Sequence, residues 1–393
     1  MEKIVNLEVF LSLANNHVRG SIMRRLISLM LSIMFILTGC NDYTKMPALS
    51  LDDQEFDGYQ FEQSLYYDYD ARIKFRVSPM VEATYLAVEM LYDKTGFTNY
   101  PDNTVFVEDS IEVFKDYKDH SFIKMLSPMI KKGYSYDAIP SSLYYFDEYF
   151  RLRNDIELDI SILKRAGGKE NLEDLLVHLK TFRMDSDFDS YFRENKELYL
   201  NMLKMGQDMV TTYKVDDIIE EFYGKPIENA TVTVTPFAQN AYGCSLIRKD
   251  GVLEMHPTLS VYENKEAFLS TLVHEFSHTY VNPLTTKHLE LVDNTKVLYE
   301  PIKKIMSNQA YSNWETTINE HIVRANTAVM IRSILGQTAY ENELNRNRER
   351  GFKYIDDVVE SILYYKENRD VYSTLEDYYP EIMKVFESLA GIN

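Results

Sequence analysis

A short β-branched stretch constrains the fold of this chain most strongly, because it interrupts a sequence that otherwise follows helical periodicity. Residues 230–235, Ala-Thr-Val-Thr-Val-Thr, alternate as a strand does. Two further strands are expected at about 242–248 and 252–256, and the Asp250-Gly251 pair between them is a strong hairpin signal. A chain with these strands among helices is expected to adopt a mostly helical α+β fold.

Helical periodicity dominates on the N-terminal side of these strands. Residues 72–77 alternate loosely as a strand, and Pro79 then opens an apolar-periodic helix that should end near Gly96. Amphipathic helices are also expected near 107–131, 170–184 and 187–222. With 45% apolar residues in a chain of 393, a large core is expected to form without disulfides.

The segment after the hairpin is expected to form a buried helix. Asn264 suits its N-cap, and the helix should run from Lys265 to about Val281, where Asn282-Pro283 ends it. Burial is indicated by its apolar residues, Phe268, Leu269, Leu272, Val273 and Phe276. The rest of the chain, to Asn393, is expected to form several more helices.

This helix carries the sequence His274-Glu275-Phe276-Ser277-His278. Positions i and i+4 lie on one helical face, about 5–6 Å apart, so both imidazoles reach a single ion. Zinc with three protein ligands keeps a position open for water, and a carboxylate beside the first histidine accepts its proton. His274 and His278 are therefore predicted zinc ligands, and Glu275 the general base. The alternative is a pair of core histidines satisfied by neighbouring side chains.

A β-hairpin followed by a helix with this motif resembles the zincin metallopeptidases. The resemblance implies a zincin-like catalytic core in which a small sheet or hairpin precedes the motif helix. It also implies that an edge strand binds an extended substrate. The metzincin branch is excluded, because Val281 and Leu284 stand where it needs glycine and histidine.

The gluzincin branch fits better, since there a glutamate on a later helix completes the site. Asn319-Glu320, in a helix expected from about Tyr311 to Leu335, resembles the Asn-Glu that supplies this ligand. Glu320 is therefore the predicted third ligand, and Glu315 is the alternative.

Residues around this third ligand leave further alternatives open. Arg324, one turn after Glu320, is placed to orient its carboxylate, although the two could instead form a solvated surface pair. Tyr311 and Tyr299 are candidates to stabilise an oxyanion, with ordinary packing as the alternative. His288 and His321 match no zinc spacing and are expected on the surface or in the core.

Short phrases elsewhere extend the resemblance. Residues 77–82, 240–243 and 323–325 are similar to an uncharacterised family of bacterial lipoproteins with a His-Glu-x-x-His motif, over about residues 72–345. This likeness implies a fold and a peptidase class, but no substrate.

The start of the chain has the parts of an export signal. Two arginines at 24–25 precede a largely apolar stretch at 26–37 that is too short to span a bilayer. The Leu-Thr-Gly-Cys that ends at Cys40 resembles the lipobox of bacterial lipoproteins, which implies cleavage before Cys40 and its acylation. An ordinary cleaved signal or a short buried helix is the alternative.

These expectations divide the chain. Residues 1–39 form the signal segment, of which 1–22 precede a better start at Met23 and indicate a misassigned start. A lipid-anchored tether (40–60), a mainly helical part (61–225) and a zincin-like catalytic part (226–393) follow. A single compact domain over 61–393 is the alternative.

Charge and cysteine content limit the partners. The formal charge of −19 repels phosphate backbones and anionic headgroups, so no nucleic acid is expected, and the membrane is contacted through the lipid alone. Cys244 is expected to be a buried free thiol. Nothing in the sequence indicates an oligomeric state.

The predicted function is zinc-dependent hydrolysis of peptide bonds, in peptide or protein substrates, at a bacterial cell envelope. A second hypothesis is a non-catalytic lipoprotein that binds peptide or glycan and has a structural or vestigial zinc. A third is a zinc hydrolase acting on a non-peptide amide. The intact Glu275 favours an enzyme, because a purely structural site needs no base.

Overall fold

The computed structural model describes residues 55–56, 59–67, 70–91, 104–261 and 264–392. The chain separates into two units, residues 1–44 and 45–393, and the first lies outside the described ranges. The predicted signal segment, Cys40 and most of the tether therefore lie outside them too. The fold below is that of the second unit.

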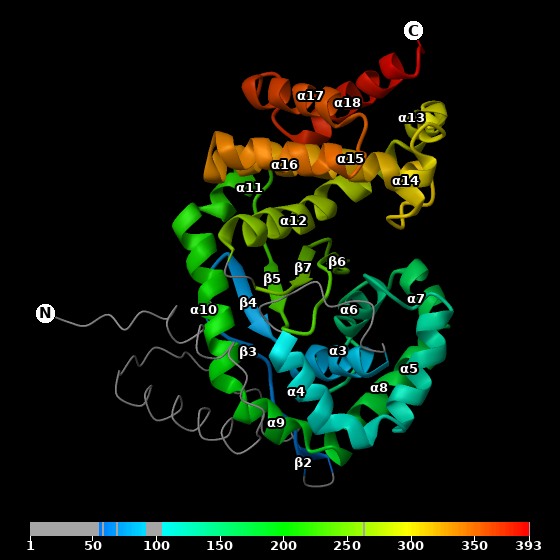
Figure 1. Cartoon of the computed structure of the whole chain (residues 1–393), viewed down its shortest axis with the longest axis vertical. Helices are drawn as coiled ribbons and strands as arrows, with labels where there is room; N and C mark the ends of the chain where they lie inside the picture. The colour runs from blue at the N-terminus through cyan, green and yellow to red at the C-terminus, as the bar shows by residue number, and fades with distance from the viewer. Residues whose placement is uncertain (1–54, 57–58, 68–69, 92–103, 262–263, 393) are drawn as a thin grey trace, which may run out of the picture. The chain divides into compact units, whose positions relative to one another are not determined.

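A five-stranded mixed sheet forms the centre of this fold (Figure 1). Its strands are β3 (Leu65–Tyr66), β4 (Ile73–Val77), β5 (Ala230–Val234), β6 (Tyr242–Ile247) and β7 (Leu253–Leu259). In the spatial order β3-β4-β5-β7-β6, the strands β4, β5 and β7 run parallel, while β3 and β6 are antiparallel to their neighbours. A separate ribbon pairs β1 (Glu55–Phe56) with β2 (Tyr59–Gln60).

Burial follows the position of each strand in the sheet. Every residue of β5 is buried, as expected for a parallel strand covered on both faces. In the edge strand β6, Cys244 and Leu246 are buried while Ser245 and Ile247 are exposed. The predicted hairpin is confirmed, and Gly251 adopts a φ of +87° in its turn, a conformation that glycine reaches without strain.

A run of helices connects β4 to β5. They are α3 (Pro79–Leu91), α4 (Thr104–Phe114), η2 (Lys115–Tyr117), α5 (Ser121–Lys131), α6 (Ala138–Leu143), α7 (Ile160–Ala166), α8 (Lys169–Asp185), α9 (Phe188–Glu194), α10 (Lys196–Tyr213) and α11 (Val215–Tyr223). Helices form in all the segments predicted here, but not with the predicted bounds. The predicted end near Gly96 lies outside the described residues, segment 107–131 is divided into α4, η2 and α5, and segment 187–222 is divided into three. Asp187 and Lys214 adopt φ values of +52° and +50°, and a further break falls at Asn195.

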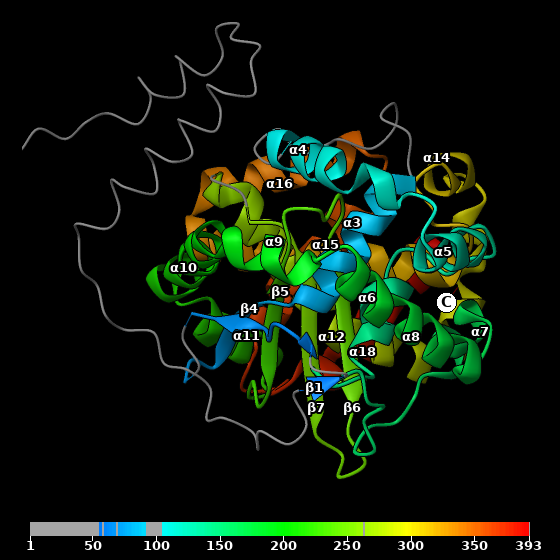
Figure 2. The ribbon, with the colours of Figure 1, turned by 90° about the horizontal axis from the view of Figure 1, so that it is seen from below.

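A second run of helices follows β7. They are α12 (Lys265–Lys287), α13 (Leu289–Asn294), η3 (Lys296–Tyr299), α14 (Lys303–Ser307), α15 (Trp314–Leu335), α16 (Gln337–Glu349), α17 (Ile355–Glu367) and α18 (Leu375–Leu389). Helix α12 packs on the sheet through β6 and β7, and α15 packs on the far side of α12 (Figures 1 and 2). The predicted motif helix is thereby enclosed between a sheet and a second buried helix.

The predicted end of the motif helix is wrong. Helix α12 continues through Pro283 and ends at Lys287. A proline inside a helix costs about 3 kcal/mol, because it removes one backbone hydrogen bond and clashes with a carbonyl. Leu284 and Thr285 are buried beyond it, and the Thr285 hydroxyl lies 2.9 Å from that of Tyr379 on α18. Packing in this last turn outweighs the cost of the proline.

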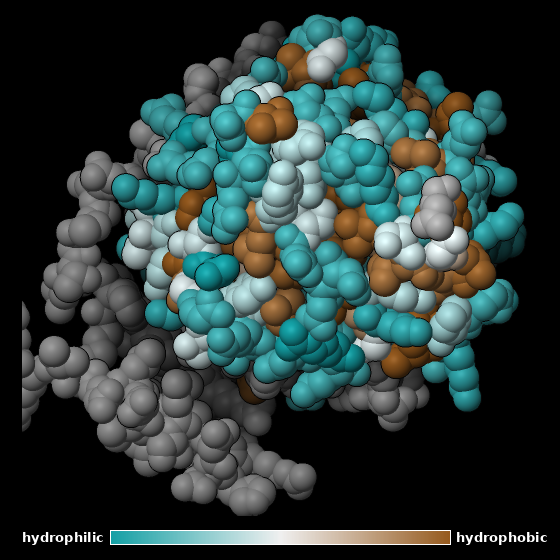
Figure 3. All heavy atoms as spheres, turned by 90° about the horizontal axis from the view of Figure 1, so that it is seen from above, coloured by the Kyte–Doolittle hydropathy of each residue, from teal (hydrophilic) through white to brown (hydrophobic). Residues whose placement is uncertain are grey.

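One cluster of buried apolar side chains extends from Ile73 on β4 to Phe386 on α18 and includes residues on both sides of position 225. Seen from the side of α16–α18, the surface is mostly hydrophilic, with apolar groups scattered between (Figure 3). No helix within the described ranges combines the length and the apolar character needed to cross a membrane.

Candidate metal centre

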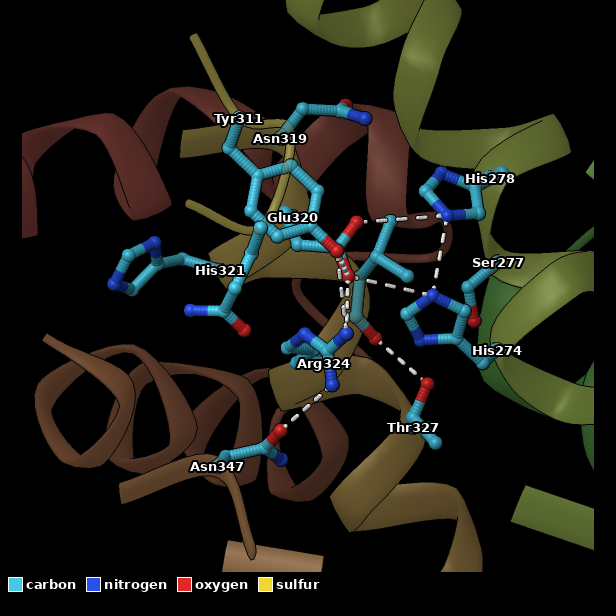
Figure 4. Close-up of polar contacts among 12 residues, drawn as sticks. His274, Ser277, His278, Tyr311, Asn319, Glu320, His321, Arg324, Thr327 and Asn347 are labelled. Carbon is cyan, nitrogen blue, oxygen red and sulfur yellow. Dashed lines mark hydrogen bonds and ion pairs between the residues drawn. The ribbon is translucent and has the colours of Figure 1, made fainter. Parts of the chain in front are cut away.

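Helix α12 places His274 and His278 one turn apart on the same face, as predicted. Asn264 fixes the start of this helix, because its side chain accepts hydrogen bonds from the N–H groups of Glu266 and Ala267. The Nε2 atoms of the two histidines lie 3.2 Å apart. Both rings are partly buried, and both Nε2 atoms point into the same space (Figure 4).

Helix α15 brings Glu320 to this space. Its Oε1 lies 3.5 Å from Nε2 of His274, and its Oε2 lies 3.6 Å from Nε2 of His278. A tetrahedral zinc ion with bonds of about 2.0–2.1 Å separates its ligand atoms by about 3.4 Å. The carboxylate lies at about this separation from both imidazoles, through a different oxygen for each. With one ligand atom taken from each residue, the three atoms lie within 4.8 Å of one another, and within the described ranges these side chains form the group that could hold a metal.

Two side chains hold the Glu320 carboxylate in place. Nη2 of Arg324 lies 2.6 Å from Oε1, and the Tyr311 hydroxyl donates to the same oxygen at 2.9 Å. Burial raises the pKa of Glu320, but Arg324, the two histidines and Tyr311 outweigh burial and hold this pKa below its usual range. The carboxylate is therefore ionised. Because Arg324 and Tyr311 both contact Oε1, Oε2 faces His278.

Arg324 is itself fixed from the far side. Its Nη1 donates to Oδ1 of Asn347 on α16 at 2.9 Å, and its guanidinium lies 4.4 Å from the ring centroid of Phe352. The solvated surface pair of Glu320 and Arg324 does not form, because both side chains are buried. The predicted orienting role of Arg324 agrees with this geometry.

A chain of polar side chains orients the second histidine. Nδ1 of His278 lies 3.1 Å from Oδ1 of Asn282, which also accepts from Nδ2 of Asn319 at 2.6 Å. The Thr285 hydroxyl in turn donates to Oδ1 of Asn319 at 2.7 Å. The tautomer with its proton on Nδ1 donates to the Asn282 oxygen and leaves the Nε2 lone pair for an ion held between the histidines and Glu320.

Glu275 lies beside the two histidines and lines the same cleft. Burial, followed by the charge of Glu320, raises the pKa of Glu275 to about 8, while Arg324 and the backbone N–H of Gly243 lower it in part. A carboxyl group with a pKa near neutrality is suited to accept and return a proton. A divalent cation held by the histidines would shift this group toward its ionised form.

A close backbone contact joins strand β6 to the motif helix. A Cβ on Gly243 would lie 2.4 Å from the carbonyl oxygen of Glu275 and 2.9 Å from Cβ of His278, so this position requires glycine. In the described part of the sheet, β6 has one strand neighbour, β7, apart from an isolated bridge at its far end between Ile156 and Arg248. The sheet edge therefore runs directly past the metal position.

A cleft of about 1090 Å³ opens onto the three ligands and Glu275. Its lining includes residues 240–243, which lead into β6, and residues of α16. Among the latter, Arg346 forms ion pairs with Glu343 at 2.6 Å and with Glu266 at 2.9 Å. Pockets for drug-sized ligands are about 300–1,000 Å³, so this cleft has room for several residues of an extended chain.

Other candidates from the sequence lie outside the metal group. Glu315, the alternative ligand, is exposed on the first turn of α15. The Tyr299 hydroxyl donates to the backbone oxygen of Tyr311 at 2.8 Å and does not line the cleft. His321 is fully buried, with Nδ1 2.8 Å from a backbone oxygen, and His288 stacks on Tyr379.

Cys244 is a buried free thiol, as predicted. The sequence prediction missed Asn282 and Asn347, which fix His278 and Arg324. Asn282 follows His278 at i+4, a spacing that signals contact on one helical face, but the Asn282-Pro283 pair predicts a helix end at this point. Asn347 lies on another helix and gave no local signal.

A family model described as "Domain of unknown function (DUF4932)" matches residues 83–385, which include β5–β7 and the whole metal group. The chain therefore belongs to the DUF4932 family. No curated protein and no solved structure matches it.

Proposed function

We propose that this protein is a zinc-dependent peptidase of the gluzincin type. The observation that carries the proposal is the convergence of His274, His278 and Glu320 at zinc-like separations, with Glu275 beside them in an open cleft. A purely structural zinc site is closed by four protein ligands. Three ligands facing a large cleft instead support a catalytic site.

Each component of the site has a separate role in the proposed reaction. When bound, zinc makes a water molecule acidic near neutral pH and polarises a carbonyl group. Glu275 is proposed to take the proton from the attacking water and to pass it to the leaving amine. The Tyr311 hydroxyl donates to Glu320 and Tyr311 lines the cleft, so of Tyr311 and Tyr299 it is the one placed to approach a developing oxyanion.

The sheet edge supports peptide as the substrate class. An extended peptide can add to an exposed sheet edge by backbone hydrogen bonds, and β6 runs past the metal position because of the close contact at Gly243. A zincin-like core, with an antiparallel edge strand above a motif helix, is part of this proposal.

The proposed location is a bacterial cell envelope, with the protein anchored through an acylated Cys40. The signal-like residues 24–40 motivate it. Cys40→Ser is expected to abolish lipid labelling and to release the protein from membranes. Equal membrane retention of wild type and variant would refute the anchor and leave the metal site unaffected.

Glu275→Gln tests the catalytic proposal, because the base takes part in the reaction without holding the ion. The variant is expected to keep its fold and zinc while turnover of a cleaved peptide falls by about 10² to 10⁴-fold. Glu315→Gln removes one negative charge from an exposed site and is the matched control, with turnover unchanged.

Two outcomes would contradict the proposal. Wild-type turnover by zinc-loaded Glu275→Gln would show that Glu275 is not the base. Absence of cleavage by the native zinc-loaded protein across a diverse peptide library would favour a binding lipoprotein instead.

A further inference from the structure

A second, smaller cavity adjoins the cleft. It has a volume of about 210 Å³ and shares Tyr136, Asn240 and Tyr242 with the cleft as a common wall. An apolar cavity of about 150 Å³ holds a benzene ring, so this one has room for a long side chain. Gly243, which touches the motif helix, directly follows Tyr242. The Tyr242 part of the shared wall therefore lies one residue, about 3.3 Å along the strand, from that contact.

The walls combine aromatic rings with one carboxylate. The rings belong to Tyr85, Tyr136, Phe237 and Tyr242, and the carboxylate belongs to Glu89 on α3. Glu89 is only 7% exposed, and one of its oxygens accepts a hydrogen bond from the side chain of Gln239. The buried Tyr85 hydroxyl has no hydrogen-bond partner among the described residues.

Tyr136 stands on the rim that the cavity and the cleft share. It is 57% exposed and adopts a φ of +54°, which is uncommon for a residue with a side chain. Such conformations cluster at binding and active sites, where the surrounding structure maintains them. An exposed aromatic residue with a constrained backbone thus lines both the cavity and the cleft.

We propose that this cavity is a specificity pocket that takes a lysine or arginine side chain of the substrate, with Glu89 as the partner of its cationic end. The proposal rests on the proposed peptidase function. A carboxylate buried against a neutral amide is costly, and a cation that reaches it forms a strong charge-assisted hydrogen bond. Aromatic faces attract the same cation, and the apolar walls suit its methylene stem.

Other side chains fit this pocket less well. A leucine or phenylalanine would fill the volume but would leave the Glu89 carboxylate with Gln239 alone and the Tyr85 hydroxyl without a partner among the described residues. An acidic side chain would place two carboxylates together. Burial raises the pKa of Glu89 to about 7, with the Gln239 hydrogen bond lowering it in part, and an entering cation would favour the ionised form.

The test compares matched peptides and matched variants. A peptide library first identifies the position at which zinc-loaded protein prefers a cation, and a pair of peptides then differs there only by Lys or Met. We expect kcat/KM to favour the Lys peptide by at least tenfold. Glu89→Gln should lower kcat/KM for the Lys peptide by about 10- to 100-fold, as for a lost hydrogen bond to a charged group, and change the Met peptide less than twofold.

Two controls distinguish loss of substrate recognition from a general effect of charge and from a loss of folding. Glu108→Gln removes an equal charge from an exposed position on α4 and should change neither peptide. In Glu89→Gln the new amide oxygen can still accept from Gln239, so an unchanged melting temperature is expected. No cationic preference in the wild type, or an equal effect of Glu89→Gln on both peptides, would overturn the pocket and leave the peptidase proposal standing.

Binding to zinc-loaded Glu275→Gln distinguishes failure of the pocket from failure of hydrolysis. The Lys peptide should bind this protein about 10- to 100-fold more tightly than the Met peptide, and adding Glu89→Gln should abolish the difference. If the native protein cleaves nothing yet this difference appears, the pocket stands and the hydrolytic function fails. If no difference appears, the pocket is refuted whatever the activity.

Discussion

Within the described ranges, two largely buried clusters pair histidine with glutamate, and one of the two has the geometry of a metal site. In the first, His274 and His278 face Glu320 at 3.5 and 3.6 Å. In the second, on β7, Nε2 of His256 lies 3.1 Å from Oε2 of Glu254, within hydrogen-bond distance. Both glutamates also contact an arginine, so composition alone does not separate the clusters.

The two clusters differ in how many carboxylate oxygens the arginine contacts. Arg153 takes both oxygens of Glu254, at 2.8 and 2.9 Å, and the histidine adds a third contact. Arg324 and Tyr311 both bind Oε1 of Glu320, so Oε2 remains directed at a histidine. The β7 cluster adjoins a cavity of about 50 Å³, whereas the metal group opens onto about 1090 Å³. A carboxylate with an unused oxygen beside a large cleft is thus what distinguishes a candidate metal centre from a buried ion pair.

Replacing one histidine in each cluster should give the largest contrast. His274→Ala removes a ligand, so the zinc content of the purified protein should fall from about one per chain to near zero. His256→Ala should keep its zinc. Metal analysis of both proteins, with circular dichroism to confirm folding, makes the comparison. Equal loss or equal retention of zinc in the two variants would contradict the claim that only the cluster of His274, His278 and Glu320 binds zinc.

Removing the two hydrogen bonds from Arg153 to Glu254 should lower the stability of the protein and leave metal binding unchanged. Arg153→Met leaves Glu254 buried with one histidine partner. The free energy of unfolding should fall by about 3 kcal/mol, the low end for a broken buried pair, since the Arg153 side chain is 20% exposed. Denaturant unfolding of the zinc-loaded protein measures this loss, and zinc content should not change. Loss of zinc in this variant would show that the two clusters act as one unit.

Local patterns predicted much of the part of the chain that holds the candidate metal site. The β5 strand, the β6–β7 hairpin and the Asn264 cap all follow from neighbouring residues. The continuation of α12 beyond Pro283 did not, because burial of that last turn against α15 and α18 depends on distant residues. The parallel pairing of β4 with β5 joins segments separated by a long run of helices, and no local signal specifies it.

The candidate site was predicted to a similar extent. The i, i+4 spacing placed His274 and His278 together, and the gluzincin resemblance selected Glu320 over Glu315. The residues that orient these ligands were harder to foresee. Arg324 lies one turn from Glu320 and was predicted, whereas Asn347 comes from α16, and its contact depends on how two helices pack.

Anomalous diffraction from crystals of the zinc-loaded protein tests the central claim most directly. Data recorded above and below the zinc absorption edge should give one peak that vanishes below the edge. We expect it within about 2.0–2.2 Å of Nε2 of His274, Nε2 of His278 and a carboxylate oxygen of Glu320, with an open position toward the cleft. A peak coordinated by Glu315 in place of Glu320, or no peak between the two histidines, would contradict the metal centre described here.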